Sequence, residues 1–336
     1  MKILVTGSAG FIGSALVLRL LERGDEVVGI DNHNDYYDPT IKMARLNQFL
    51  DHPNYTHLKI DLSDHEAMAM AFSTSKPQRV VNLAAQAGVR YSIKNPMAYI
   101  NSNIVGFTHI LEGCRHNKVE HLVYASSSSV YGSNTSIPFS VHDNVDHPLS
   151  LYAATKKSNE LMAHSYSNLF DLPTTGLRFF TVYGPWGRPD MALFLFTKNI
   201  LENKPIEVFN KGNHSRDFTY IDDIVKGILL CNENIAKTSL DWDSNSLNPS
   251  ESSAPFKVYN IGSSEKVSLD SYIEAIESEL GKKAERELLP LQPGDIPDSL
   301  ADISLLTKET GYKPETNYKE GVSNFIKWYK SYYGYK

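Results

Sequence analysis

This chain of 336 residues has few cysteines, little net charge and no long apolar run. Its two cysteines, Cys114 and Cys231, lack a metal-ligating or redox spacing, so we expect buried free thiols in a reducing cytoplasm. A net charge of −6 gives no general attraction for nucleic acid or anionic membranes. The apolar run at the N-terminus is too short for a signal peptide, and no later run approaches a membrane span. We therefore expect a soluble, cytoplasmic protein with no bound metal.

Short β-branched apolar runs alternate with longer amphipathic segments as far as residue 180, which is typical of a parallel sheet buried on both faces. The sequence predicts a doubly wound, Rossmann-type α/β domain over residues 1–180 and a smaller substrate lobe over residues 181–336. The expected strands are residues 2–7, 26–31, 57–61, 79–85, 121–126 and 174–180.

The C-terminal part has fewer regular elements. Ser268 precedes an apolar helical face that stops at Gly281, which predicts a capped helix, and another helix is expected from about Tyr318. Residues 256–262 are expected to form a strand that returns to the main sheet. The Ser/Asn/Pro-rich segment 237–256 predicts a flexible surface loop.

A glycine-rich motif follows the first predicted strand. Gly7, Gly10 and Gly13 would let the backbone and a helix N-terminus approach a pyrophosphate. Asp31, at the end of the second strand, can bind an adenosine ribose and would repel a 2′-phosphate, which favours NAD over NADP. Asp61 could reach the adenine or simply cap a helix. Further cofactor contacts are expected from Phe11, Ile12, Asn32, Leu62, Leu83, Ala84, Ala85, Ala87 and Ser102.

A candidate acid–base group follows the fifth strand. Tyr152 and Lys156 are one helical turn apart on the same face, and an ammonium near a phenol lowers the phenol's pKa. Tyr152 is therefore a candidate general base. The serine run at 126–129 lies where such sheets bind ligands, so one of its hydroxyls could contact the same substrate oxygen, or the run could be only a polar loop.

Together these motifs, with "LRFFTVYGP" (177–185), resemble the extended short-chain dehydrogenase/reductase family, in its branch of nucleotide-sugar epimerases and dehydratases. The segments 215–228 and 293–302 are similar to that branch's C-terminal motifs, so the resemblance covers essentially the whole chain. It implies a tightly held NAD, a UDP-sugar substrate and a homodimer. It also implies that Ser127, Tyr152 and Lys156 are the catalytic residues.

The same resemblance implies removal of the sugar 4-OH proton by the tyrosinate and passage of the C4 hydride to NAD⁺. Dehydratases of this family carry Asp-Glu where this chain has Ser128 and Ser129, so water elimination is disfavoured. The segment 184–192 is most similar to UDP-glucuronate 4-epimerases. We hypothesise that Arg188 and Thr181 hold the sugar carboxylate and prevent loss of CO₂, although they could be a solvated arginine and a strand residue.

The nucleotide end of the site is less complete in the sequence. Arg216 resembles the arginine that clamps the diphosphate, whereas the usual second arginine is Gln292 here. Arg90 could supply the missing charge or only cap a helix. Further substrate contacts are expected from Val208, Phe209 and Asp295, although core packing would explain the two apolar side chains as well.

The leading hypothesis is an NAD-dependent 4-epimerase that interconverts UDP-glucuronate and UDP-galacturonate. The alternatives are a UDP-hexose or UDP-N-acetylhexosamine 4-epimerase, a UDP-glucuronate decarboxylase, and a non-catalytic NAD-sensing module. The presence of Ser127, Tyr152 and Lys156 together argues against the last, since a sensor needs none of them.

Overall fold

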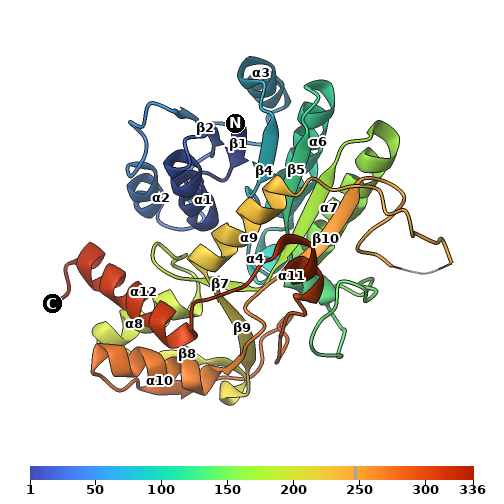
Figure 1. The fold of residues 1–336 in the computed structure, drawn as a ribbon. Coiled ribbons are helices and arrows are strands. Elements are labelled where there is room, and N and C mark those ends of the chain that lie inside the picture. The colour runs from blue at the N-terminus through green and yellow to red at the C-terminus, as the bar shows by residue number, and fades with distance from the viewer. Residues whose placement is uncertain (246–247) are drawn as a thin grey trace.

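The computed structural model describes residues 1–245 and 248–336. Its centre is a parallel sheet of seven strands in the order β10-β6-β5-β4-β1-β2-β3 (Figure 1). This is the doubly wound arrangement that the sequence predicts, with the reversal of strand order between β1 and β4. The strands are β1 (Lys2–Thr6), β2 (Glu26–Ile30), β3 (Tyr55–Leu58), β4 (Arg79–Asn82), β5 (His121–Ser127), β6 (Thr174–Phe179) and β10 (Phe256–Ile261).

Helices cover both faces of this sheet, as the unbroken apolar strands require. Alternate residues of β1 show the layering, because Ile3 and Val5 belong to one buried cluster and Leu4 to another. The first cluster contains side chains of α1 (Phe11–Glu22), α2 (Pro39–Leu46) and α9 (Ile221–Glu233). The second contains side chains of α3 (His65–Ser75), α6 (Gly106–His116) and α7 (Leu151–Phe170). Short helices α4 (Tyr91–Lys94), α5 (Pro96–Tyr99), η1 (Ile100–Val105) and η2 (Ser128–Tyr131) complete this part.

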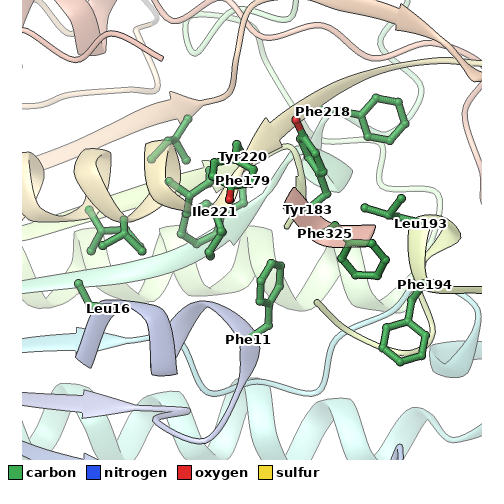
Figure 2. Close-up of a cluster of buried hydrophobic side chains, with 14 of the residues drawn as sticks. Phe11, Leu16, Phe179, Tyr183, Leu193, Phe194, Phe218, Tyr220, Ile221 and Phe325 are labelled. Atoms are coloured by element: carbon green, nitrogen blue, oxygen red, sulfur yellow. The ribbon is translucent and has the colours of Figure 1, made fainter. Parts of the chain in front are cut away.

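The C-terminal lobe is built on two small sheets, in the orders β11-β9-β7 and β12-β8. Its strands are β7 (Thr181–Tyr183), β8 (Ile206–Val208), β9 (Ser215–Tyr220), β11 (Lys266–Ser268) and β12 (Arg286–Leu288). Its helices are α8 (Ala192–Leu201), η3 (Phe209–Gly212), α10 (Leu269–Leu280), α11 (Ser304–Thr310) and α12 (Tyr318–Tyr333). Figure 2 shows that Phe11 of α1, Phe179 of β6 and Phe218 of β9 share one apolar cluster, so the lobe and the main sheet have a continuous core.

The C-terminal elements that the sequence predicts are present. The Ser268 hydroxyl accepts a hydrogen bond from the Ser271 amide at 3.1 Å, and α10 ends at Gly281 with φ +64°. The strand β10 pairs in parallel with β6, which confirms the predicted return to the main sheet. The helix α9 also packs against α1. The segment after residue 180 therefore supplies one strand, β10, and one helix, α9, to the first part of the fold.

The segment 237–256 has no helix or strand in residues 237–245 and 248–255, and residues 246–247 lie outside the described part. Its end is anchored, because the Ser252 hydroxyl lies 2.9 Å from the ring Nε2 of His164. Cys114 and Cys231 are buried free thiols, as predicted. No helix formed by the described residues is both long and apolar enough to cross a membrane.

Candidate active site

A cavity of about 670 Å³ follows the carboxyl ends of the sheet strands and continues into the C-terminal lobe. Every residue predicted to hold the cofactor lines this cavity, as does every predicted substrate residue except Val208. In β8, Ile206 and Val208 point into the core, whereas Glu207 and the following Phe209 line the cavity. Alternation along a strand explains this difference, so the prediction that Val208 lines a ligand pocket is wrong.

The glycine-rich turn leaves no room for side chains at its closest approaches. Gly7 has φ +73°, and a Cβ there would lie 2.9 Å from the Ala84 nitrogen. A Cβ at Gly13 would lie 2.0 Å from the Gly7 carbonyl oxygen. The helix α1 begins after Gly10, which has no side chain to cap it, so the backbone N–H groups of its first turn face the cavity uncovered. This surface fits the pyrophosphate of a dinucleotide.

Asp31 is fixed beside this turn. Its Oδ2 accepts a hydrogen bond from the Ala9 amide at 3.1 Å, and its Oδ1 accepts one from the His33 amide at 2.9 Å. The side chain is 8% exposed and lines the cavity. A fixed carboxylate at the end of β2 fits the ribose of NAD and would repel the additional phosphate of NADP.

Asp61 lies next to this group and is not a helix cap. Its carboxylate accepts hydrogen bonds from Asn32 Nδ2 at 2.7 Å and from the Ser63 amide at 2.8 Å. Burial raises the pKa of Asp61, but the hydrogen bonds from Ser63 and Asn32 outweigh this effect and hold the pKa below its usual value. The cap of α3 is Asp64, which accepts a hydrogen bond from the Ala67 amide at 3.0 Å.

The predicted acid–base pair comes from α7. Lys156 is 3% exposed, and its Nζ donates a hydrogen bond to the Ala125 carbonyl at 2.9 Å. Burial lowers the pKa of Lys156 to about 8. Burial also raises the pKa of Tyr152. The hydrogen bond with the Ser127 hydroxyl and the charge of Arg188 lower this pKa, but by less than burial raises it. That the Lys156 ammonium lowers the pKa of the Tyr152 phenol stays a prediction.

The serine run divides between two directions at the end of β5. Ser127, Ser128 and Ser129 line the cavity, and Ser127 Oγ accepts a hydrogen bond from the Ser129 amide at 3.1 Å. Ser126 Oγ instead donates a hydrogen bond to Glu160 Oε1 at 2.6 Å. The run is therefore more than a polar loop, because its hydroxyls begin η2 and anchor the strand to α7.

Sequence reasoning missed a buried ion pair behind the serines. Arg178 of β6 donates two hydrogen bonds to Glu160 of α7, both at 2.9 Å, and a third to the Tyr131 hydroxyl at 3.1 Å. Arg178 is fully buried and Glu160 is 3% exposed. The available signals were an arginine within an apolar strand and an acid one turn after Lys156 on the same helix.

Arg188 lies where the cavity enters the C-terminal lobe. Its Nε and Nη2 donate to the two carboxylate oxygens of Asp190 at 3.0 and 2.5 Å, and the Tyr36 hydroxyl donates to the same carboxylate at 3.1 Å. Burial lowers the pKa of Arg188, but Asp190 raises it by more, so the guanidinium is charged. Among residues 1–245 and 248–336, no other group accepts from Arg188, so both Nη1 hydrogens and one Nη2 hydrogen could bind a ligand. The Thr181 hydroxyl lines the same cavity and has no hydrogen-bond partner within residues 1–245 and 248–336.

Two more arginines line the far end of the cavity. Arg216 Nη2 donates a hydrogen bond to Asp295 Oδ1 at 3.0 Å. The Arg90 guanidinium carbon lies 5.0 Å from the centre of the Phe209 ring, and its side chain makes no capping hydrogen bond to α4. The Gln292 Oε1 atom is buried and has no partner in the part of the chain that the structure describes. Two cationic side chains therefore line this end of the cavity, where they would suit an anionic part of a ligand.

A dinucleotide turn, a Tyr/Lys/Ser group lining the same cavity and a second cationic end define an NAD-dependent enzyme that acts on a nucleotide-linked substrate. Residues 3–262 match the model of the NAD dependent epimerase/dehydratase family, and the chain belongs to this family. Together with the similarities below, this identifies the chain as an NAD-dependent nucleotide-sugar epimerase.

Three similarities illustrate the relationship. Protein CapI of Staphylococcus aureus is 55% identical over 333 residues, which are 99% of each chain. UDP-glucuronate 4-epimerase 4 of Arabidopsis thaliana is 46% identical over 98% of this chain and 76% of its own. The crystal structure of UDP-glucuronic acid 4-epimerase from Bacillus cereus, in complex with UDP-glucuronic acid and NAD, is 34% identical. It superposes with a TM-score of 0.87 over 99% of this chain and 100% of its own.

Proposed function

We propose that the chain is a 4-epimerase that interconverts UDP-glucuronate and UDP-galacturonate. The observation that carries this proposal is the presence, in the same cavity as the Tyr152 phenol, of a charged arginine and of a threonine hydroxyl without a partner in the described part of the chain. The Arg188 charge lowers the pKa of Tyr152, so the two groups are close enough to interact electrostatically. The named Arabidopsis and Bacillus relatives support the same substrate.

Tyr152 would take the 4-OH proton and later return it to the same oxygen. The Ser127 hydroxyl would donate a hydrogen bond to that oxygen, and it already favours the ionised form of Tyr152. NAD, when bound, accepts the C4 hydride and gives it back to the other face of the sugar. The residues that would hold it are the glycine-rich turn, Asp31 and Asp61, with Lys156 beside the reacting end.

The 4-keto hexuronate formed on this route loses CO₂ readily unless its carboxylate is restrained. Asp190 occupies the Nε/Nη2 side of the Arg188 guanidinium, so the sugar carboxylate would bind the remaining Nη1/Nη2 end. The Thr181 hydroxyl would donate a further hydrogen bond. The guanidinium would then still bind the substrate carboxylate through two nitrogens, while Asp190 holds it in place.

The test is to incubate the purified protein with UDP-glucuronate, without added cofactor, and to follow products by proton NMR. UDP-galacturonate without UDP-pentose is the expected result. Turnover of UDP-glucose or its N-acetylated analogue, with the uronate untouched, would show that the substrate is wrong. UDP-pentose as the main product would show a decarboxylase.

The carboxylate grip is tested by Arg188→Ala. We expect UDP-pentose to form, or affinity for the uronate to fall about 100-fold, because a charge-assisted pair is lost. Arg19→Ala is the matched control, since that arginine lies on α1 and pairs with Glu22 at the surface. Normal epimerisation of the uronate by Arg188→Ala would refute the grip.

A further inference from the structure

Arg45 is a buried arginine that no part of the proposed reaction uses. It comes from α2, is fully buried, and none of its nitrogens lies within 4 Å of an acidic side chain of residues 1–245 and 248–336. Its hydrogen bonds go to backbone carbonyls and one hydroxyl instead. Burying a charged guanidinium without a carboxylate costs free energy unless its N–H groups are hydrogen-bonded. The charged donor in turn binds these acceptors strongly and fixes their positions.

These partners come from two loops of the candidate active site. Arg45 Nε and Nη2 donate to the Trp186 carbonyl at 3.0 and 2.7 Å, and Nη2 also donates to the Gly187 carbonyl at 3.2 Å. Nη1 donates to the Ala9 carbonyl in the glycine-rich turn at 3.4 Å. One side chain therefore joins the turn that would hold the cofactor to the two residues that directly precede Arg188.

The loop before Arg188 needs this support because its backbone is unusual. Trp186 has φ +64°, a left-handed conformation that residues with a side chain adopt only when their surroundings impose it. Its ring packs against Trp328 and Tyr332 of α12, with ring centres 5.1 Å apart in both cases. Arg45 binds the carbonyl of the same residue, so the turn is fixed by its side chain on one side and its backbone on the other.

The segment before α2 supports Arg188 itself. Arg45 Nη1 donates to the Tyr37 hydroxyl at 2.7 Å, and the adjacent Tyr36 hydroxyl donates to Asp190, which holds the Arg188 guanidinium. Arg45 thus acts on both the backbone before Arg188 and the segment that carries the Tyr36 hydroxyl. Arg45, Trp186 and Gly187 themselves are not among the residues that line the cavity.

We propose that Arg45 is a positioning residue that sets the place of the Arg188 guanidinium and so determines recognition of the substrate's carboxylate. The inference rests on the proposed function, because it assigns Arg188 to a carboxylate. A misplacement of about 1 Å at such a group is enough to cost about 100-fold in an enzyme. The ligand class that depends on Arg45 is therefore a nucleotide sugar with an acidic group, and neutral nucleotide sugars do not depend on it.

The experiment compares three ligands on the NAD-containing enzyme by calorimetry: UDP-glucuronate, UDP-glucose and UDP. Arg45→Lys keeps the charge but cannot bind both loops at once. We expect its Kd for UDP-glucuronate to rise about 10- to 100-fold, while the Kd values for UDP-glucose and UDP change less than about 3-fold. We also expect UDP-pentose among its products by NMR.

The matched control is Arg79→Lys. Arg79 is 8% exposed and also donates to a backbone carbonyl, that of Asn232 at 2.6 Å, but it lies at the start of β4, away from the cavity. It should leave all three affinities unchanged. If Arg45→Lys does not fold, Tyr36→Phe removes only the hydroxyl that holds Asp190 and should weaken UDP-glucuronate selectively, by about 3- to 10-fold.

Two outcomes would overturn the inference. Equal weakening of all three ligands by Arg45→Lys would show a general structural role, and no weakening of UDP-glucuronate would show no role. The wild-type measurement separates these from a failure of the proposed function. If the wild-type enzyme binds UDP-glucuronate no more tightly than UDP-glucose, the proposed function fails, and the inference fails with it.

Discussion

Replacing Lys156 with methionine should make the protein more stable while it abolishes turnover. The buried ammonium has a pKa of about 8, whereas an exposed lysine has 10.5. A shift of one pKa unit corresponds to about 1.36 kcal/mol, so burial of the Lys156 ammonium lowers the free energy of unfolding by about 3 kcal/mol at pH 7. Methionine leaves the Ala125 carbonyl without the Lys156 hydrogen bond, which costs about 1 kcal/mol. We therefore expect a net gain of about 2 kcal/mol in the free energy of unfolding.

The gain should depend on pH in a definite direction. Because the folded pKa of Lys156 lies below the unfolded pKa, the unfolded chain binds more protons between about pH 8 and 10.5. The wild type therefore becomes more stable relative to Lys156→Met as the pH rises through this interval. Urea unfolding of both cofactor-free proteins at pH 7 and pH 10 measures the difference. Lys156→Met should have the higher free energy of unfolding at pH 7, and most of this difference should disappear at pH 10.

Lys257→Met is the control, because its change in the free energy of unfolding at pH 7 should have the opposite sign. Burial lowers the pKa of Lys257, but Glu251 at 2.6 Å and Glu309 at 3.0 Å outweigh it and raise the pKa. Its stabilisation is present below the unfolded pKa and is lost as the pH rises through the folded pKa. Lys257→Met should therefore be less stable than the wild type at pH 7. A Lys156→Met protein that is also less stable at pH 7, or whose difference ignores pH, would refute the reasoning.

Three further changes test other parts of the site. Gly13→Ala places a Cβ 2.0 Å from the Gly7 carbonyl oxygen, so it should lower the free energy of unfolding in urea by about 1–3 kcal/mol. The purified variant should also contain no NAD, and retained NAD would contradict this. Arg178→Met leaves the Glu160 carboxylate buried without its guanidinium and should lower the free energy of unfolding by about 3–5 kcal/mol. The double variant with Glu160→Gln should lose less stability. Equal losses would show that the ion pair is not the cause. Tyr152→Phe should lower kcat about 100- to 10,000-fold with little change in the Kd of UDP-glucuronate, and a loss seen only in Kd would argue against a general base.

Buried parallel strands could be predicted closely, because they are unbroken apolar runs. The fifth strand was expected at 121–126 and is His121–Ser127. The third was expected at 57–61 and is Tyr55–Leu58. This strand lies at an edge of the sheet and is only partly buried, so its apolar pattern is weak.

The candidate site could be predicted where its residues follow strand ends, because those ends meet at one edge of a parallel sheet. Asp31 and Ser127 are such residues. Arg45 and Asp190 could not be found in this way, since their roles depend on a helix and a loop that meet only in the folded chain. Val208 was misplaced because a three-residue strand gives no pattern from which its inward face can be recognised.

The return of β10 to the main sheet has a consequence for synthesis on the ribosome. The strand β6 ends at Phe179, but its outer neighbour begins only at Phe256. At ~5–20 residues per second the intervening segment takes on the order of ten seconds to translate. During that time the edge of β6 is an open template for other chains. A nascent chain stalled before Phe256 is therefore a substrate for chaperones, and a gene truncated at the end of β6 should yield inclusion bodies.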